Sequence, residues 1–75
     1  MTLVDLKIGE SAVIDGVYTA KGLRESLLDM GFIGGERVKL LFKSPLGDPF
    51  AYLVRGAVLA LRKEDAGLVS VVCDR

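Results

Sequence analysis

The sequence predicts a mainly β fold with one short helix, in which about five antiparallel strands form a small, strongly bent and partly open barrel. Three observations predict it. Several short segments are rich in β-branched and aromatic residues, turns containing Gly or Pro separate most of them, and one further segment has the periodicity of an amphipathic helix. The 75 residues are expected to form a single domain over residues 1–75.

Residues 11–18 are predicted to form the first strand, because β-branched residues partly alternate there and a Gly-containing turn precedes them. Residues 22–30 then change to a helical pattern. At roughly 100° per residue, Leu23, Leu27 and Met30 fall within one narrow arc. We expect that arc to face the core of the domain.

Gly31 follows the helical segment, where a left-handed C-terminal cap favours a residue without a Cβ atom. The chain returns to a strand pattern in residues 37–43. Here Val38, Leu40 and Phe42 alternate with charged residues, apart from one interruption, so we expect these three side chains on the buried face of the strand.

Two turns define the next strands. Residues 44–49 contain two prolines around Gly-Asp, which suits a turn between strands that pair antiparallel. The segments 50–54 and 57–61 are joined by only Arg55 and Gly56. This spacing predicts a tight hairpin in which Gly56 supplies the positive φ that such turns need.

The C-terminal residues complete the predicted sheet. Residues 62–66 suit one helical turn, and residues 68–73, which are rich in Val, suit the last strand. We expect this strand to pair with the first one. Closure of this kind limits the number of exposed strand edges.

Charges are balanced and dispersed, with ten Lys and Arg against ten Asp and Glu. A nucleic-acid-binding groove needs clustered positive charge, so no nucleic-acid partner is expected. The longest runs without a charge or turn residue have about five residues, far below the roughly 20 that span a bilayer, so no membrane insertion is expected. The chain also lacks a secretory signal pattern and has a single Cys, so we expect a cytoplasmic location.

The apolar content is high for so short a domain, at 51% of residues with a mean hydropathy of +0.42. A contiguous apolar surface would suit a partner protein or self-association. Apolar residues scattered singly over the surface would explain the same composition, so the sequence leaves both explanations open.

Catalytic and metal-binding patterns are absent from the sequence. There is no His, Cys73 is the single Cys, and the acids are dispersed, so neither a metal site nor a nucleophile with its base can be assembled. We therefore expect no enzymatic activity, no cofactor and no tightly bound metal. Residues 31–35 contain three glycines, but they follow a helix and lack the Lys-Ser or Lys-Thr of a phosphate-binding loop, which favours a structural role.

Leu28 is the one apolar helical residue that lies off the predicted core-facing arc. It is roughly 100° around the helix from Leu27 and falls between Arg24 and Glu25. Two explanations stay open: Leu28 is exposed for a partner, or it packs under a neighbouring loop such as residues 44–49.

The chain resembles the FeoA domain family along almost its whole length. The resemblance rests on a linked set of short motifs: Leu6 to Gly9, Leu27-Leu28-Asp29-Met30-Gly31-Phe32 with Gly35, Pro45-Leu46-Gly47-Asp48-Pro49, Gly56, Ala60-Leu61-Arg62, Glu64 to Ala66, and Val71. Gly34 departs from the family, which usually has Pro at that position before the glycine. This difference affects a turn and leaves its role unchanged.

The resemblance implies an SH3-like barrel that is not an enzyme and that acts as an accessory protein of bacterial ferrous-iron uptake. It implies contact with the membrane transporter FeoB, through the cytoplasmic GTPase region of that protein. Because the same family occurs as the C-terminal domain of iron-responsive repressors, a stand-alone version of that domain is an alternative. A self-associating interaction module is another.

The contact surface is a hypothesis from the helix pattern and does not come from the family. We expect an apolar face rimmed by arginines to bind the partner, because a few central apolar or Arg side chains carry most of the energy of such contacts. The residues in this hypothesis are Arg24, Leu28, Phe32, Tyr52 and Arg55.

Overall fold

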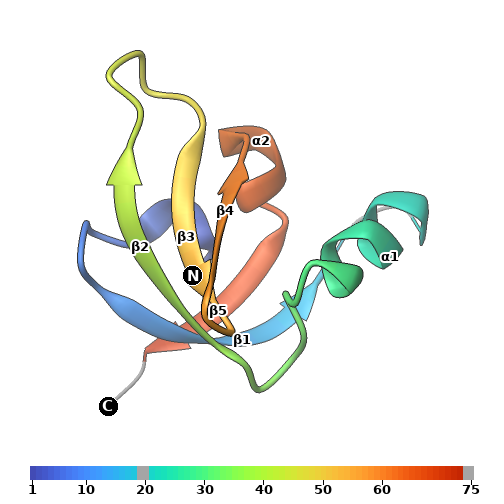
Figure 1. The fold of residues 1–75 in the computed structure, drawn as a ribbon. Coiled ribbons are helices and arrows are strands. Elements are labelled where there is room, and N and C mark those ends of the chain that lie inside the picture. Colours follow the sequence, from blue (N-terminus) through green and yellow to red (C-terminus); the bar gives the residue numbers. More distant parts are fainter. Residues whose placement is uncertain (19–20, 74–75) are drawn as a thin grey trace.

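The computed structural model describes residues 1–18 and 21–73, without the side chains of residues 21 and 23. Five strands, two short α-helices and one 3-10 helix follow one another along this part of the chain (Figure 1). In order they are η1 (Leu3–Asp5), β1 (Ser11–Val17), α1 (Lys21–Asp29), β2 (Arg37–Lys43), β3 (Phe50–Val54), β4 (Ala57–Leu61), α2 (Lys63–Ala66) and β5 (Val69–Cys73).

The strands form one antiparallel sheet in the order β4-β3-β2-β1-β5. Figure 1 shows that the sheet is strongly curved, with β1 and β5 running across β2, β3 and β4. The mainly β, partly open barrel that the sequence predicts is therefore confirmed, as is the pairing of the last strand with the first. Bounds agree for β2, β3 and β4, and β1 and β5 are each one residue shorter than predicted.

The β3–β4 hairpin has the tight turn that its sequence predicts. Arg55 has a φ of 52° and Gly56 a φ of 81°, so both central residues are in the left-handed region. This conformation is typical of a type I′ turn, whose twist matches the right-handed twist of the two strands.

An irregularity in β2 overturns the prediction that Phe42 is buried. The β2–β3 register shifts between Leu40 and Phe42, so an additional residue of β2 is inserted at Leu41. Val38 and Leu40 are buried as expected, but Phe42 is 56% exposed. Since successive strand residues point to opposite faces, one inserted residue moves every later side chain to the other face.

The end of α1 overturns the prediction that Met30 faces the core. Leu27 is buried as expected, whereas Met30 is 39% exposed; the Leu23 side chain lies outside the described residues. Gly31 has a φ of 109°, and Phe32 N–H donates to the Leu27 carbonyl oxygen at 3.1 Å. This left-handed cap folds Phe32 back under the last turn, so Phe32 fills the core position that the periodicity assigned to Met30.

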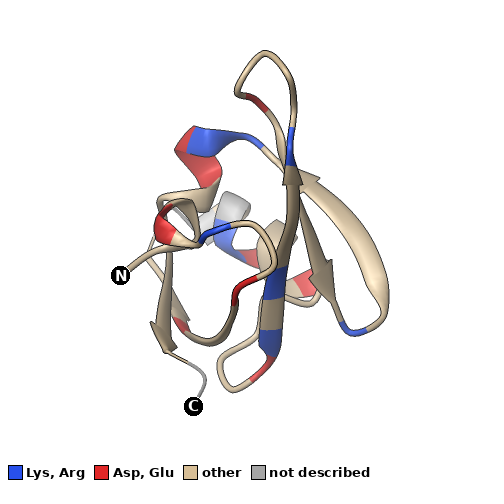
Figure 2. Cartoon of the chain, turned by 90° about the vertical axis from the view of Figure 1, so that its left-hand side faces the viewer, with Lys and Arg blue, Asp and Glu red and all other residues tan. Residues whose placement is uncertain are grey.

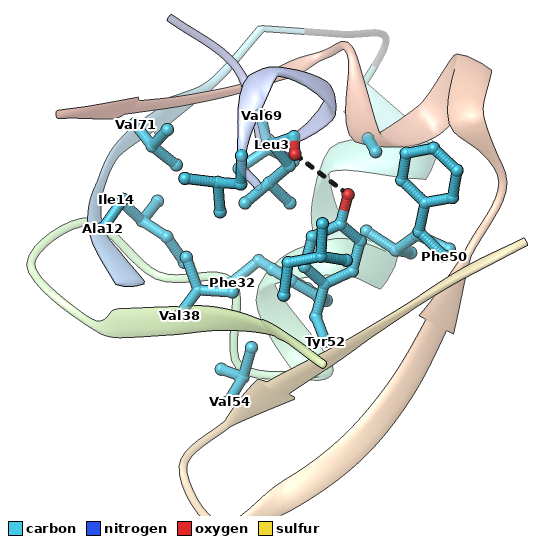
Figure 3. Close-up of a cluster of buried hydrophobic side chains, with 14 of the residues drawn as sticks. Leu3, Ala12, Ile14, Phe32, Val38, Phe50, Tyr52, Val54, Val69 and Val71 are labelled. Atoms are coloured by element: carbon cyan, nitrogen blue, oxygen red, sulfur yellow. Dashed lines mark hydrogen bonds between the residues drawn. The ribbon is translucent and has the colours of Figure 1, made fainter. Parts of the chain in front are cut away.

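The core lies inside the curved sheet and is closed by the N-terminal segment (Figure 3). Leu3 in η1 is fully buried, and Thr2 forms an isolated bridge with Ser70 of β5. No element is predicted for residues 3–5, where the structure has the 3-10 helix η1. The buried cluster consists of Leu3, Leu6, Ala12, Ile14, Val17, Leu27, Phe32, Val38, Leu40, Phe50, Tyr52, Val54, Leu61, Ala66, Val69 and Val71.

Candidate functional site

The structure separates the five predicted contact residues into two groups. Phe32 and Tyr52 are fully buried, whereas Arg24 and Arg55 are exposed and Leu28 is partly buried. The prediction that Phe32 and Tyr52 contact a partner is wrong for the folded chain, because neither side chain presents any surface to solvent. A contact surface must be built from the other three residues and their neighbours.

Tyr52 is a core residue with a satisfied polar end. Its hydroxyl donates a hydrogen bond to the main-chain carbonyl oxygen of Leu3 at 3.1 Å (Figure 3). Burial raises the pKa of the Tyr52 hydroxyl, because the charged phenolate would lose its hydration. Tyr52 is therefore held neutral as a hydrogen-bond donor, and its role is structural.

Arg55 lies where the end of α1 meets the β3–β4 turn, and Leu28 and Arg24 lie on α1 itself. A Cβ atom added at Gly31 would be 3.2 Å from Cδ of Arg55, so the side chain of Arg55 packs on the C-terminal cap of α1. Gly31 N–H donates to the carbonyl oxygen of Leu28 at 3.0 Å, and Arg24 precedes Leu28 by one helical turn. We refer to Arg24, Leu28 and Arg55 as the helix–turn surface.

A second apolar surface lies on the outer face of the sheet. Leu53 of β3 is paired with Val58 of β4, and residues paired in this way point to the same face. The bulge in β2 brings Phe42 to that face, opposite Ala51. Val58 is 60% exposed and Leu53 is partly buried. We refer to Phe42, Leu53 and Val58 as the outer sheet patch.

The sequence contains a signal for this patch. Leu41 interrupts the alternation of apolar and charged residues in the segment 37–43. An apolar residue out of register is what a bulge produces, since one extra residue shifts the alternation. With this interruption taken as a bulge, Phe42 would have been assigned to the outer face.

Acidic and basic positions are interspersed over the fold (Figure 2). Arg62 and Glu64 form an ion pair with an N–O distance of 3.8 Å, and both side chains are largely exposed. Solvent screens such pairs, so this one contributes little to stability. Lys43 places its Nζ atom 5.1 Å from the centre of the Phe50 ring, which is a cation–π contact.

No three His, Cys, Asp or Glu side chains of residues 1–18 and 21–73 come together in a group that could hold a metal ion. None of the helices in this same part of the chain is long and apolar enough to cross a membrane.

A family sequence model, a relative and solved structures all match this chain over nearly its whole length. The sequence model of the FeoA domain family matches residues 1–73. The chain is 35% identical over 71 residues to a fusion protein of Porphyromonas gingivalis, named Fe(2+) transport protein A/Fe(2+) transporter FeoB. That match covers 95% of this chain and 8% of the fusion protein, so the chain spans only a small fraction of this relative.

Solved structures of FeoA proteins match closely in fold. The FeoA protein of Chlorobium tepidum is 34% identical, with a TM-score of 0.89 over 95% of this chain and 68% of that one. A zinc complex of FeoA from Stenotrophomonas maltophilia, described as an SH3 domain protein, is 34% identical, with a TM-score of 0.85 over 96% and 89% of the two chains.

A manganese-dependent transcriptional repressor has a TM-score of 0.86 over 97% of this chain and 41% of its own, but at 14% identity it shows a shared fold alone. The family match has a broader basis, since the sequence model and relatives above 30% identity cover nearly all of the 75 residues. The chain belongs to the FeoA domain family, an SH3-like family of ferrous iron transport.

Proposed function

We propose that this chain is a cytoplasmic accessory protein of ferrous-iron uptake that regulates a FeoB-type transporter by direct contact and catalyses no reaction itself. The observation that carries the proposal is the relative in Porphyromonas gingivalis, whose name joins transport protein A and transporter FeoB in one polypeptide. Fusion keeps two modules at a high effective concentration, which benefits modules that bind each other. Separate chains would then need a contact surface for the same purpose.

The helix–turn surface suits a reversible contact of this kind. It combines one partly buried apolar side chain, Leu28, with two exposed guanidinium groups, those of Arg24 and Arg55. Arginine is enriched at the centres of protein–protein contacts because its planar head group binds carboxylates in a bidentate manner while its stem packs against apolar surface. The soluble GTPase region of the transporter is the proposed partner.

Titration calorimetry of the purified chain against that GTPase region, with and without guanine nucleotide, tests the proposal. The variant Leu28→Glu places a charge in the helix–turn surface. Val72→Glu is the matched control, because Val72 is an exposed apolar residue on β5, at the opposite edge of the sheet from β4. Saturable binding that Leu28→Glu abolishes and Val72→Glu preserves supports the proposal; absence of binding by the parent chain contradicts it.

The likeness to the manganese-dependent repressor adds no second function. At 14% identity it concerns the fold, and the described residues contain no cluster of metal-ligating side chains that would favour metal sensing. Contact with the transporter is therefore the function that we propose.

A further inference from the structure

The two edges of the open sheet differ in how well they are covered. At the β5 edge, Val71 N–H donates to the carbonyl oxygen of Met1 at 2.8 Å, and Thr2 bridges Ser70. The N-terminal segment therefore occupies part of that edge. Within the described residues, β4 at the opposite edge is paired with β3 alone (Figure 1).

The register identifies the main-chain groups that β4 presents at its open edge. In a hairpin with a two-residue turn, the residues flanking the turn, here Val54 and Ala57, form a hydrogen-bonded pair, and such pairs alternate along the ladder. Leu59 is therefore bonded to β3. Val58 and Ala60 fall at the alternate positions, so their N–H and C=O groups point away from β3.

This edge lacks the features that usually prevent strand pairing. Proteins protect edge strands with charged side chains, prolines or bulges. The β4 sequence Ala-Val-Leu-Ala-Leu contains no charge and no proline, and its pairing with β3 has no register shift. The outer sheet patch lies directly beside it, since Val58 is both an edge residue and a member of that patch.

Positive charges stand at both ends of the edge, and at the second end the carboxylate of Asp48 also lies close, accepting the main-chain N–H of Lys63 at 2.8 Å. Arg55 precedes β4, Arg62 and Lys63 follow it, and all three residues are exposed. The strands of the β3–β4 hairpin carry no charge between these ends (Figure 2). Glu64 pairs with Arg62 at 3.8 Å, but that pair is largely exposed and a further carboxylate can compete for the guanidinium group.

We propose that the β4 edge binds an extended segment of a partner protein as a sixth strand, with apolar residues in the middle of the segment and carboxylates at both ends. The main-chain groups of Val58 and Ala60 would pair with the segment, and the outer sheet patch would contact its apolar side chains. The terminal carboxylates would bind Arg55 at one end and Arg62 or Lys63 at the other.

A second copy of this chain fits the edge less well. Two β4 strands that pair antiparallel about Leu59 would bring Arg55 of one copy next to Lys63 of the other, at both ends of the contact. Like charges that face each other across strands are destabilising. In this register the charges disfavour a second copy, whereas the positive charges of Arg55, Arg62 and Lys63 complement a foreign segment with acidic ends.

The test is an NMR titration of the isotope-labelled chain with the blocked synthetic peptide acetyl-Glu-Glu-Val-Thr-Val-Thr-Val-Glu-Glu-amide. We expect the Val58 and Ala60 amide signals to shift and their hydrogen exchange to slow, whereas Leu59, already bonded to β3, changes less. A peptide with Lys in place of every Glu is expected to bind at least about tenfold more weakly. These results do not depend on whether the transporter is the partner.

Matched variants locate the site. Val58→Glu is expected to weaken peptide binding by about tenfold or more, because it adds a repelling charge and removes apolar contact. Val72→Glu, at an exposed apolar position on the other edge strand, is expected to leave binding unchanged. Arg55 belongs to both this site and the helix–turn surface, whereas Leu28 belongs to the helix–turn surface alone. Leu28→Glu is therefore expected to keep the Val58 and Ala60 shifts on peptide addition, which separates the β4 main-chain contact from the contact made by Leu28.

Four results would overturn the proposal. The first is an absence of β4 amide shifts at peptide concentrations up to about 1 mM. The second is equal affinity for the acidic and the basic peptide. The third is unchanged peptide binding by a Val58→Glu variant that circular dichroism shows to be folded. The fourth is protection of the Val58 and Ala60 amides in a peptide-free dimer, detected by sedimentation. That result would assign the edge to a second copy of the chain.

Discussion

The hydroxyl of Tyr52 and the main-chain carbonyl of Leu3 are joined by a buried hydrogen bond of 3.1 Å between residues 49 positions apart in the sequence. Tyr52 lies on β3, which is paired on both sides within the sheet, and Leu3 lies in the N-terminal η1. The same N-terminal segment covers part of the β5 edge through Thr2. The bond therefore links the N-terminal segment that closes the barrel to strand β3.

Removal of this bond should destabilise the chain. In Tyr52→Phe the Leu3 carbonyl loses its side-chain donor but still accepts the N–H of Leu6 at 3.3 Å. We therefore expect the free energy of unfolding to fall by about 0.5–1.5 kcal/mol, the net contribution of one hydrogen bond. Urea denaturation measures the change. Tyr18→Phe is the control, because Tyr18 is 67% exposed and its variant should retain the stability of the parent. Equal stability of parent and Tyr52→Phe would contradict the role assigned to the bond.

The burial of Tyr52 also predicts that the free energy of unfolding depends on pH in the alkaline range. Burial raises the pKa of Tyr52 above its ordinary value of 10.0, so the folded state favours the neutral phenol more than the unfolded state does. The resulting stabilisation is complete below about pH 10 and is lost as the pH rises further, because the unfolded chain releases the proton first. The free energy of unfolding should fall more steeply above that pH in the parent than in Tyr52→Phe. Equal slopes of the free energy of unfolding against pH in the two proteins would exclude Tyr52 as the cause of this pH dependence.

Leu27 anchors α1 to the barrel. It is fully buried, so Leu27→Ala should lower the free energy of unfolding by about 2–5 kcal/mol through lost burial and the cavity left behind. Thermal denaturation should show a clearly lower midpoint. Leu46→Ala makes the same chemical change at a position that is 94% exposed and should melt with the parent. A Leu27→Ala midpoint within a degree or two of the parent's would show that α1 is not held by this side chain.

The β3–β4 turn depends on Gly56. With a φ of 81°, this position costs an L-residue about 1 kcal/mol, so Gly56→Ala should be destabilised by that amount in urea denaturation. Gly34→Ala is the control. An added Cβ at Gly34 meets only ordinary contact, 3.7 Å from the carbonyl oxygen of Asp15, and its φ is not in the left-handed region. The two variants should therefore differ in stability, and equal losses would argue against a conformational cause.

Local chemistry in the sequence was sufficient for most of the sheet. Charged residues and turn signals mark the ends of β2, β3 and β4, and Arg55-Gly56 leaves room for only a two-residue hairpin turn. The faces of β3 could not be predicted in the same way. All five of its residues, from Phe50 to Val54, are apolar or aromatic, so the strand has no alternation from which the buried position of Tyr52 could be read.

The candidate site was only partly predictable for related reasons. Helical periodicity placed Leu28 off the core-facing arc, but it could not show that Gly31 redirects the chain and buries Phe32 in place of Met30. The packing of Arg55 on the end of α1 joins segments that are distant in sequence. Such long-range contacts follow from the curvature of the sheet and leave no local pattern in the sequence.

The dissociation constant of this chain for the soluble GTPase region of a FeoB-type transporter tests the central claim most directly, compared among the parent, Leu28→Glu and Val72→Glu. We predict saturable binding by the parent, a loss of at least about tenfold in Leu28→Glu and none in Val72→Glu. Absence of binding by the parent would contradict regulation through the helix–turn surface. Equal losses of affinity in folded Leu28→Glu and Val72→Glu would contradict it as well.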